Sequence, residues 1–145
     1  KLMNFWPPFL GAGIKLKTIS PDFRHVEVQM KLSALNANYV GTHYGGSLYS
    51  MTDPFYMLML LENLGSEFIV WDKAASIRFR KPGKGKVTAT FRLTEDILNH
   101  IKKATADGSK FEPVFDIHIK DEGGDTVAEV QKTLYVKKKD RTKTR

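Results

Sequence analysis

The sequence predicts an α+β fold in which an antiparallel β-sheet of five to six strands wraps around one long central helix. Three observations predict it. Apolar and polar residues alternate strictly in several short runs, as they do in half-buried strands. Turn-forming segments separate these runs, which favours antiparallel pairing of consecutive strands. One further segment is apolar on nearly all sides, a pattern typical of a buried helix.

An apolar segment opens the chain, and its aromatic residues flank two prolines in the run Phe5-Trp6-Pro7-Pro8-Phe9. Such a segment is too apolar to remain in water. We therefore expect residues 1–10 to pack on the rest of the protein, where they could form a lid over a pocket. A single domain is expected over residues 1–137, followed by a basic tail at 138–145.

The strands are predicted from alternation and the turns between them from their Gly, Pro, Asp and Ser content. The alternating runs are Val26 to Leu32, Ala75 to Phe79, Val87 to Leu93 and Phe115 to Ile119. The turn segments are Ser20 to Asp22, Pro82 to Gly85 and Glu122 to Asp125.

Two segments have the composition of helices. The stretch from Ser47 to Leu64 is apolar nearly all round and ends before Gly65, so it predicts the buried central helix. The stretch from Thr94 to Ala104 starts with a capping threonine and two acids and ends with lysines, which predicts a short surface helix. One sheet leaves part of the central helix uncovered. We therefore expect a homodimer or a dimer of dimers.

The composition excludes several classes of protein. The chain has 145 residues, 41% of them hydrophobic, and no cysteine, which rules out thiol chemistry and a disulfide scaffold. The longest apolar run, residues 55–61, is far shorter than the roughly 20 residues that span a bilayer. No secretion signal is recognisable at the start. We expect a cytoplasmic protein that does not bind a membrane.

The net charge of +7 is unevenly distributed. Residues 137–145 carry a net +5, and the segment from Arg78 to Lys86 adds five basic residues and no acid. We call these five residues the basic corner: Arg78, Arg80, Lys81, Lys84 and Lys86. The remaining 127 residues sum to −3. Because the tail contains no aromatic residues and no nucleic-acid motif is present, we do not expect nucleic-acid binding.

The residues with the most chemical potential lie between Asn36 and Pro54. Gly45 and Gly46 precede the predicted helix, where free backbone N–H groups and the missing side chains suit an oxyanion site. Asp53 follows about two helical turns later, on much the same face. A carboxylate that faces inward from an apolar helix is costly unless it is paired or used.

Plainer interpretations of the same residues remain open. The two glycines could form an ordinary turn, and Asp53-Pro54 could cap a second helical segment that begins at the proline. His43 and Tyr44 could be hydrogen-bonded packing residues.

At these positions the sequence resembles the hotdog-fold acyl-CoA thioesterases of the phenylacetate-pathway and medium-chain type, and more closely an uncharacterised branch of that superfamily. Their pattern is Asn-x-x-Gly-Thr-x-His-Gly-Gly, then six residues and Asp. The matching residues here are Asn38, Gly41, Thr42, Gly45, Gly46 and Asp53. One position departs, because Tyr44 stands where those enzymes have histidine and His43 lies one place earlier.

The resemblance implies a hydrolase that cleaves acyl-CoA to free acid and coenzyme A, with its site at a dimer interface. The four histidines lack metal-binding spacing and no phosphate-loop motif occurs, so we expect no metal and no bound redox cofactor. The resemblance also implies that Asp53 is the general base or the nucleophile and that the Gly46 N–H polarises the thioester carbonyl. It further implies that Asn38 positions water or substrate, usually from the facing subunit. Ser76 is a candidate for a supporting contact, and His43, Tyr44 and Gly45 for substrate binding.

The basic corner is a candidate site for the phosphates of coenzyme A, through Arg78, Arg80 and Lys81 in particular. Around a Pro-Gly turn, however, such charges are often simply solvated.

Two other functions stay open on the same fold. The protein could bind or sense acyl-CoA without cleaving it, which the histidine-to-tyrosine change at Tyr44 favours. It could also be a hydratase or dehydratase with His43 as the catalytic histidine.

Overall fold

The computed structural model describes residues 2–140. Within them, one antiparallel sheet runs in the order β1-β2-β4-β6-β7-β3, and β5 pairs with β7 at the side of this path. The strands are β1 (Ile14–Ile19), β2 (His25–Lys31), β3 (Phe68–Phe79), β4 (Lys86–Arg92), β5 (Lys110–Phe111), β6 (Val114–Lys120) and β7 (Thr126–Lys138). The helices are the 3-10 helix η1 (Leu2–Phe5) and the α-helices α1 (Pro7–Ala12), α2 (Gly45–Ser50), α3 (Phe55–Leu64) and α4 (Glu95–Ala104).

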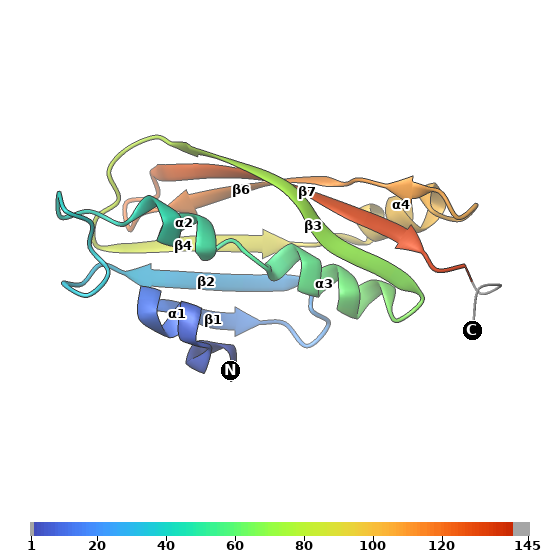
Figure 1. Cartoon of the computed structure of the whole chain (residues 1–145), viewed down its shortest axis with the longest axis horizontal. Helices are drawn as coiled ribbons and strands as arrows, with labels where there is room; N and C mark the ends of the chain where they lie inside the picture. Colours follow the sequence, from blue (N-terminus) through green and yellow to red (C-terminus); the bar gives the residue numbers. More distant parts are fainter. Residues whose placement is uncertain (1, 141–145) are drawn as a thin grey trace.

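The predicted α+β fold class is confirmed, since the curved sheet packs around the segment that contains α2 and α3 (Figure 1). Alternation places β2, β4 and β6 correctly because every second side chain of these strands points into the core. The run Ala75 to Phe79 is also a strand, within β3, but its alternate residues are not buried. In β2 the buried residues Val26 and Val28 pair with Phe91 and Ala89 of β4. The residues between them on both strands are more exposed and face outward.

The central helix differs from its prediction, because it is interrupted between α2 and α3 (Figure 1). Pro54 lacks a backbone N–H and fixes its own φ angle, so the helical hydrogen-bond ladder ends before it and starts again after it. The peptide bond between Asp53 and Pro54 is cis. A second helical segment does follow this dipeptide, but it begins at Phe55 with Pro54 as its N-cap, and the Asp53 side chain does not cap it, so Asp53 lies in the turn.

Helix α3 fixes this turn against the sheet through aromatic packing. The ring of Tyr56 stacks on Phe115 of β6 with centroids 4.0 Å apart, and the ring of Phe55 lies 5.0 Å from that of Phe91. Burial of such side chains stabilises the fold by about 1.5–3 kcal/mol each. The α3 end of the break is thus tied to the core.

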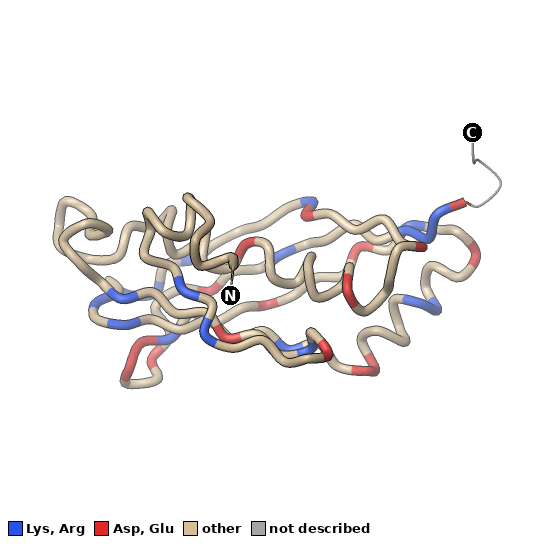
Figure 2. Tube along the Cα trace, turned by 90° about the horizontal axis from the view of Figure 1, so that it is seen from below, with Lys and Arg blue, Asp and Glu red and all other residues tan. Residues whose placement is uncertain are grey.

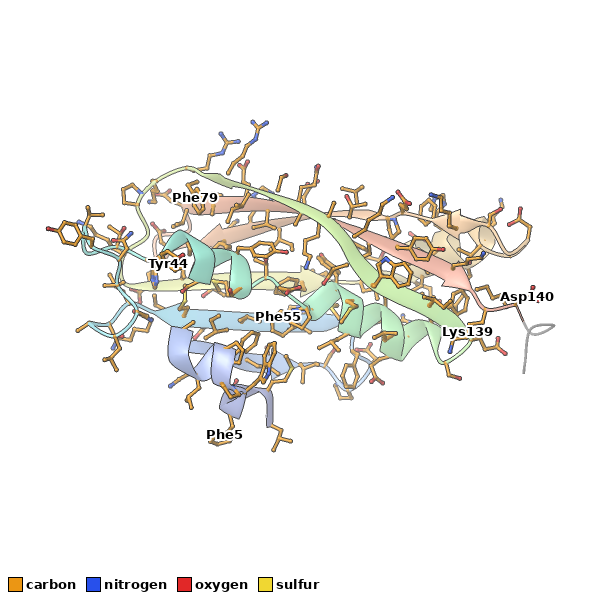
Figure 3. All side chains as sticks on the ribbon, viewed as in Figure 1. Phe5, Tyr44, Phe55, Phe79, Lys139 and Asp140 are labelled. Atoms are coloured by element: carbon orange, nitrogen blue, oxygen red, sulfur yellow. The ribbon has the colours of Figure 1, made fainter. Side chains whose placement is uncertain are left out.

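The N-terminal segment and the surface helix lie at opposite ends of the sheet (Figure 1). Phe9 of α1 is only 1% exposed, and its ring lies 5.9 Å from that of Phe55. Phe5 points away from the body of the protein (Figure 3). The surface helix has its predicted threonine cap, because the Thr94 hydroxyl accepts a hydrogen bond from the Ile97 N–H at 3.3 Å.

Strand β3 is a long edge strand of twelve residues that pairs only with β7 in the described part of the chain. Most of its residues are at least partly exposed, and they include the large side chains of Trp71 and Phe79. Unpaired edges of this length and apolar character are typical of strands that pair with another chain.

Acidic residues from β7 and the turn before it contact the basic corner; Figure 2 shows the intermixing of the two signs of charge along the chain. Lys81 contacts Asp121 at 2.6 Å and Asp125 at 2.7 Å, and Arg80 contacts Glu129 at 2.6 Å. The basic corner is thus less positive than the sequence alone suggests. Of the basic tail, residues 141–145 lie outside the described residues. No helix within residues 2–140 combines the length and apolar character needed to cross a membrane.

Candidate functional site

Asp53 lies in the turn between α2 and α3 and forms an ion pair with a buried lysine of β7. Its Oδ1 lies 2.7 Å from Nζ of Lys132, and the same Nζ lies 3.0 Å from Oδ2 of Asp72 on β3. The Lys132 side chain is 1% exposed, whereas that of Asp53 is 45% exposed. Lys132 therefore holds the Asp53 carboxylate from the protein side, and the other side of the carboxylate is open to solvent.

The two carboxyl groups around Lys132 have opposite pKa shifts. Burial raises the pKa of the Asp53 carboxyl, but its hydrogen bonds with Lys132 and Asp72 outweigh burial, so the pKa lies below its ordinary value. Burial and the neighbouring Asp53 carboxyl raise the pKa of Asp72. For Lys132, burial opposes ionisation and both carboxylates favour it, which leaves its pKa raised. Asp53 is thus an anion beside a lysine that keeps its charge.

The two glycines of the motif are covered by aromatic rings. A Cβ on Gly45 would lie 2.9 Å from the ring of Phe79, and one on Gly46 would lie 2.5 Å from Cε1 of Tyr44. Only glycine allows this close approach. Tyr44 and Phe79 lie at the same end of the molecule (Figure 3). The first hydrogen bond of α2 runs from the Leu48 N–H to the Tyr44 carbonyl, so the helix itself does not use the Gly46 N–H.

Asn38 organises its own loop. Its Oδ1 accepts hydrogen bonds from the N–H groups of Val40 and Thr42, and its amide donates to the Thr42 hydroxyl at 2.9 Å. The loop leads to His43, which is 3% exposed and whose Nε2 lies 2.9 Å from the Gly85 carbonyl. Burial lowers the pKa of His43, and the hydrogen bond to Gly85 only partly opposes this. With its ring buried and Nε2 engaged by the Gly85 carbonyl, His43 has the contacts expected of a hydrogen-bonded packing residue.

One cavity of about 450 Å³ brings several of the candidate residues together. Loop 38–43, the start of α2 and the segment after β3 form its walls. The candidates that line it are Asn38, His43, Gly45, Arg80 and Lys81. Leu48 and Phe79 add apolar surface to the same cavity. Tyr44 instead lines a neighbouring hollow with Ser47 and the end of α1.

Ser76 and Arg78 lie apart from Asp53. They line a groove of about 340 Å³ on the outer face of the sheet, where Arg80 joins them beside Asp116 and His118. Ser76 pairs with Gln131, the neighbour of Lys132, and alternation sends these neighbours to opposite faces of the sheet. Within one chain, Ser76 therefore does not reach the Asp53 carboxylate.

Lys132 and Asp72 are not among the residues singled out from the sequence, although a signal for the lysine exists. Val130, Lys132, Leu134 and Val136 occupy alternate positions of β7, so the pattern places Lys132 among inward residues. A lysine in such a register is almost never buried unless it is paired. Asp72 carries no comparable signal, because β3 is exposed on both faces and its register shifts between Asp72 and Ala74.

The sequence matches one described family over nearly its whole length. The family model described as "Domain of unknown function (DUF4442)" matches residues 1–136. The chain belongs to this family. No match was found among proteins with curated descriptions.

Solved structures with the same architecture include several thioesterases. A Pseudomonas aeruginosa protein described as of unknown function and "Probable Thioesterase" has a TM-score of 0.84 and 23% identity, covering 95% of this chain and 92% of its own. For a thioesterase from Haemophilus influenzae the TM-score is 0.67, with 17% identity and coverage of 93% and 85%. The E. coli PaaI protein from the phenylacetic acid degradation operon has a TM-score of 0.62, 20% identity and coverage of 91% and 83%.

These neighbours confirm the hotdog fold that the sequence predicts. At such low identity the likeness concerns the fold, so the chemistry rests on the site itself. Among residues 2–140, no three His, Asp or Glu side chains gather closely enough to hold a metal ion.

Proposed function

We propose that the protein is an acyl-CoA thioesterase in which Asp53 is the reactive carboxylate. The observation that carries the proposal is the ion-paired yet solvent-accessible state of Asp53, which keeps a charged carboxylate at the break of the central helix. Solved neighbours described as thioesterases share this fold and support the same reaction class. The proposed reaction needs no cofactor.

In the proposed reaction, Asp53 takes a proton from water as the water oxygen attacks the thioester carbonyl carbon. The negative charge that develops on the carbonyl oxygen accepts a hydrogen bond from the Gly46 N–H. The tetrahedral intermediate then collapses, the carbon–sulfur bond breaks, and the coenzyme A sulfur leaves with the proton held by Asp53. The alternative order, in which Asp53 attacks the carbonyl itself and water hydrolyses the resulting anhydride, uses the same groups.

The cavity lined by His43, Gly45 and Leu48 is the proposed path for the substrate, with Arg80 and Lys81 at its polar side. Arg78 and Lys84, elsewhere in the basic corner, are proposed to meet the phosphates of coenzyme A. Tyr44 covers the glycines and is proposed to contact the acyl group or the pantetheine arm. Ser76, on the outer face of the sheet, is proposed to contact a substrate that is held between two copies of the protein.

The homodimer is part of the proposal. The unpaired edge and exposed side chains of β3 favour pairing with a second copy, which would cover the open side of α2 and α3. Asn38 would then belong to the site of the facing subunit, where the loop that it shapes helps to position water or substrate.

A panel of acyl-CoA substrates with detection of free thiol tests the proposal. We expect turnover in the wild-type protein and a loss of at least about 100-fold in kcat for Asp53→Asn. This variant leaves Lys132 paired with Asp72, so its fold is expected to survive. Glu62→Gln on the exposed face of α3 is the matched control. Equal turnover in wild type and Asp53→Asn would contradict the assignment of Asp53.

A second candidate function is acyl-CoA binding without turnover. The observation that favours it is Tyr44, whose ring covers Gly46 where the thioesterases have histidine. Calorimetric binding of acyl-CoA without release of free thiol would support this candidate over the first.

A further inference from the structure

Lys132 is the most deeply buried charged side chain beside the proposed reactive group. Its side chain is 1% exposed, whereas those of its ion-pair partners Asp53 and Asp72 are 45% and 24% exposed. A buried ammonium is costly unless its donors are satisfied. The fold therefore keeps a positive charge in its core, with the ammonium of Lys132 against Oδ1 of Asp53.

The contacts of Lys132 come from separate parts of the chain. Asp53 belongs to the turn after α2, Asp72 to β3 and Lys132 to β7. Within α2, the ring of Tyr49 lies 5.7 Å from Nζ of Lys132. Because an ammonium has three N–H donors, two carboxylates and one ring face can surround it. These contacts hold the Asp53 turn to the two strands at the edge of the sheet.

We propose that Lys132 is a positioning residue, anchored by Asp72, that fixes the Asp53 carboxylate through Oδ1 and keeps it ionised for catalysis. The inference rests on the proposed function for its catalytic part. It does not require Lys132 to touch substrate, and its burial behind Asp53 places it on the protein side of the carboxylate. Asp53 belongs to neither α2 nor α3, so hydrogen bonding within a helix does not fix the direction of its side chain.

The pH dependence follows from the charges around Asp53. The groups that face it are the ammonium of Lys132 from β7 and the carboxyl of Asp72 from β3, while Tyr49 of α2 faces the ammonium. Removal of the ammonium leaves burial as the main influence and raises the pKa of Asp53. Activity that needs an ionised Asp53 is complete when the pH is above this pKa, and it falls as the pH drops through it. In a variant without the ammonium, the acidic limb of the pH–activity profile is therefore expected to move to higher pH.

The test is the pH profile of kcat/KM for Lys132→Met, with the pKa of Asp53 measured by carbon NMR of its carboxyl group. We expect the acidic limb and the pKa of Asp53 to rise together by about 1–3 units. Lys132→Arg keeps the charge, so it is expected to retain the wild-type limb while kcat falls, because a planar guanidinium replaces the ammonium. Lys138→Met, at an exposed position of the same strand, is the matched control.

Should Lys132→Met fail to fold, Lys132→Met combined with Asp72→Asn also removes the charge of the half-buried Asp72, and the acidic limb is again expected to move to higher pH. An unshifted acidic limb in a folded, active variant would overturn the positioning role and leave the thioesterase proposal standing. A wild-type protein without thioesterase activity would instead overturn the proposed function and the catalytic use of Lys132. Independently of activity, an Asp53 pKa above its ordinary value in the wild-type protein would contradict the inference.

Discussion

The ring of Tyr44 lies so close to Gly46 that a Cβ on the glycine would come within 2.5 Å of Cε1. The side chain that replaces the histidine of the thioesterases thus covers the backbone proposed to polarise the substrate. Tyr44 is 59% exposed, so its ring can move without disturbing the core. A substitution that displaces this ring is therefore expected to change the kinetics of the site without lowering the stability of the fold.

Gly46→Ala is expected to lower kcat/KM by about tenfold, because the new methyl group would lie 2.5 Å from Cε1 of Tyr44 and displace the ring that covers the proposed oxyanion site. Its melting temperature should stay within a few degrees of the wild type, since the displaced Tyr44 ring is exposed. Gly11→Ala is the control, because nothing lies within 4 Å of a Cβ there. Steady-state kinetics and thermal unfolding check both effects. Wild-type kinetics in Gly46→Ala would exclude Gly46 from the site.

The basic corner gives a prediction about coenzyme A. Arg80 and Lys81 are engaged by acids, whereas Arg78 and Lys84 form no ion pair within the described residues. Arg78→Ala and Lys84→Ala are therefore expected to raise the KM for acyl-CoA by about three- to tenfold. The KM for the matching acyl-pantetheine, which lacks the adenosine phosphates, should not change. A rise for both substrates would instead indicate a change in the acyl site.

His43 gives a prediction for stability against pH. Burial holds its pKa below the ordinary value of 6.5, so the folded state favours the neutral ring. The contribution of the neutral His43 ring to the free energy of unfolding is complete above about pH 6.5. It is lost as the pH falls toward the pKa of the folded state, with a slope of up to about 1.4 kcal/mol per pH unit. Urea unfolding of His43→Gln should show less of this dependence between pH 6.5 and 5, and exposed His118→Gln should retain it. Identical slopes in all three proteins would refute this linkage.

The open edge of β3 predicts a dimer in solution. Light scattering should give twice the chain mass of 16.5 kDa. Ala74 lies near the middle of β3, where antiparallel pairing of two copies brings equivalent positions close together. Ala74→Asp would place like charges across that interface and is expected to shift the mass toward the monomer. Val114→Asp, at an exposed site on β6, should leave the mass unchanged. A monomeric wild type would count against the proposed dimer.

Much of the fold could be predicted because one physical rule, the burial of alternate side chains, acts locally. Val26, Val28 and their partners in β4 needed no information beyond their own strands. The break at Pro54 was visible in the sequence as an alternative, since proline both interrupts and begins helices. An apolar run alone does not show whether it forms one continuous helix or two helices separated at the proline.

The site was less predictable because its key contact joins residues that are 79 positions apart. Asp53 could be identified from its motif and from the cost of an inward carboxylate. Its partner Lys132 depends on which strand lies behind the turn, and that is a property of sheet topology. The charges of Arg80 and Lys81 could be counted, but their neutralisation by Glu129 and Asp121 arises only when β3 and β7 pair.

The burial of Lys132 also determines its reactivity toward reagents that modify amines. A primary amine reacts only when it is accessible and has lost its proton, and Lys132 is enclosed and held protonated by two carboxylates. Exposed lysines such as Lys84 and Lys138 should be acetylated in the native protein while Lys132 remains unmodified. Lys132 would be labelled only on unfolding. Its labelling would therefore report whether the edge of the sheet and the turn that carries Asp53 are still joined.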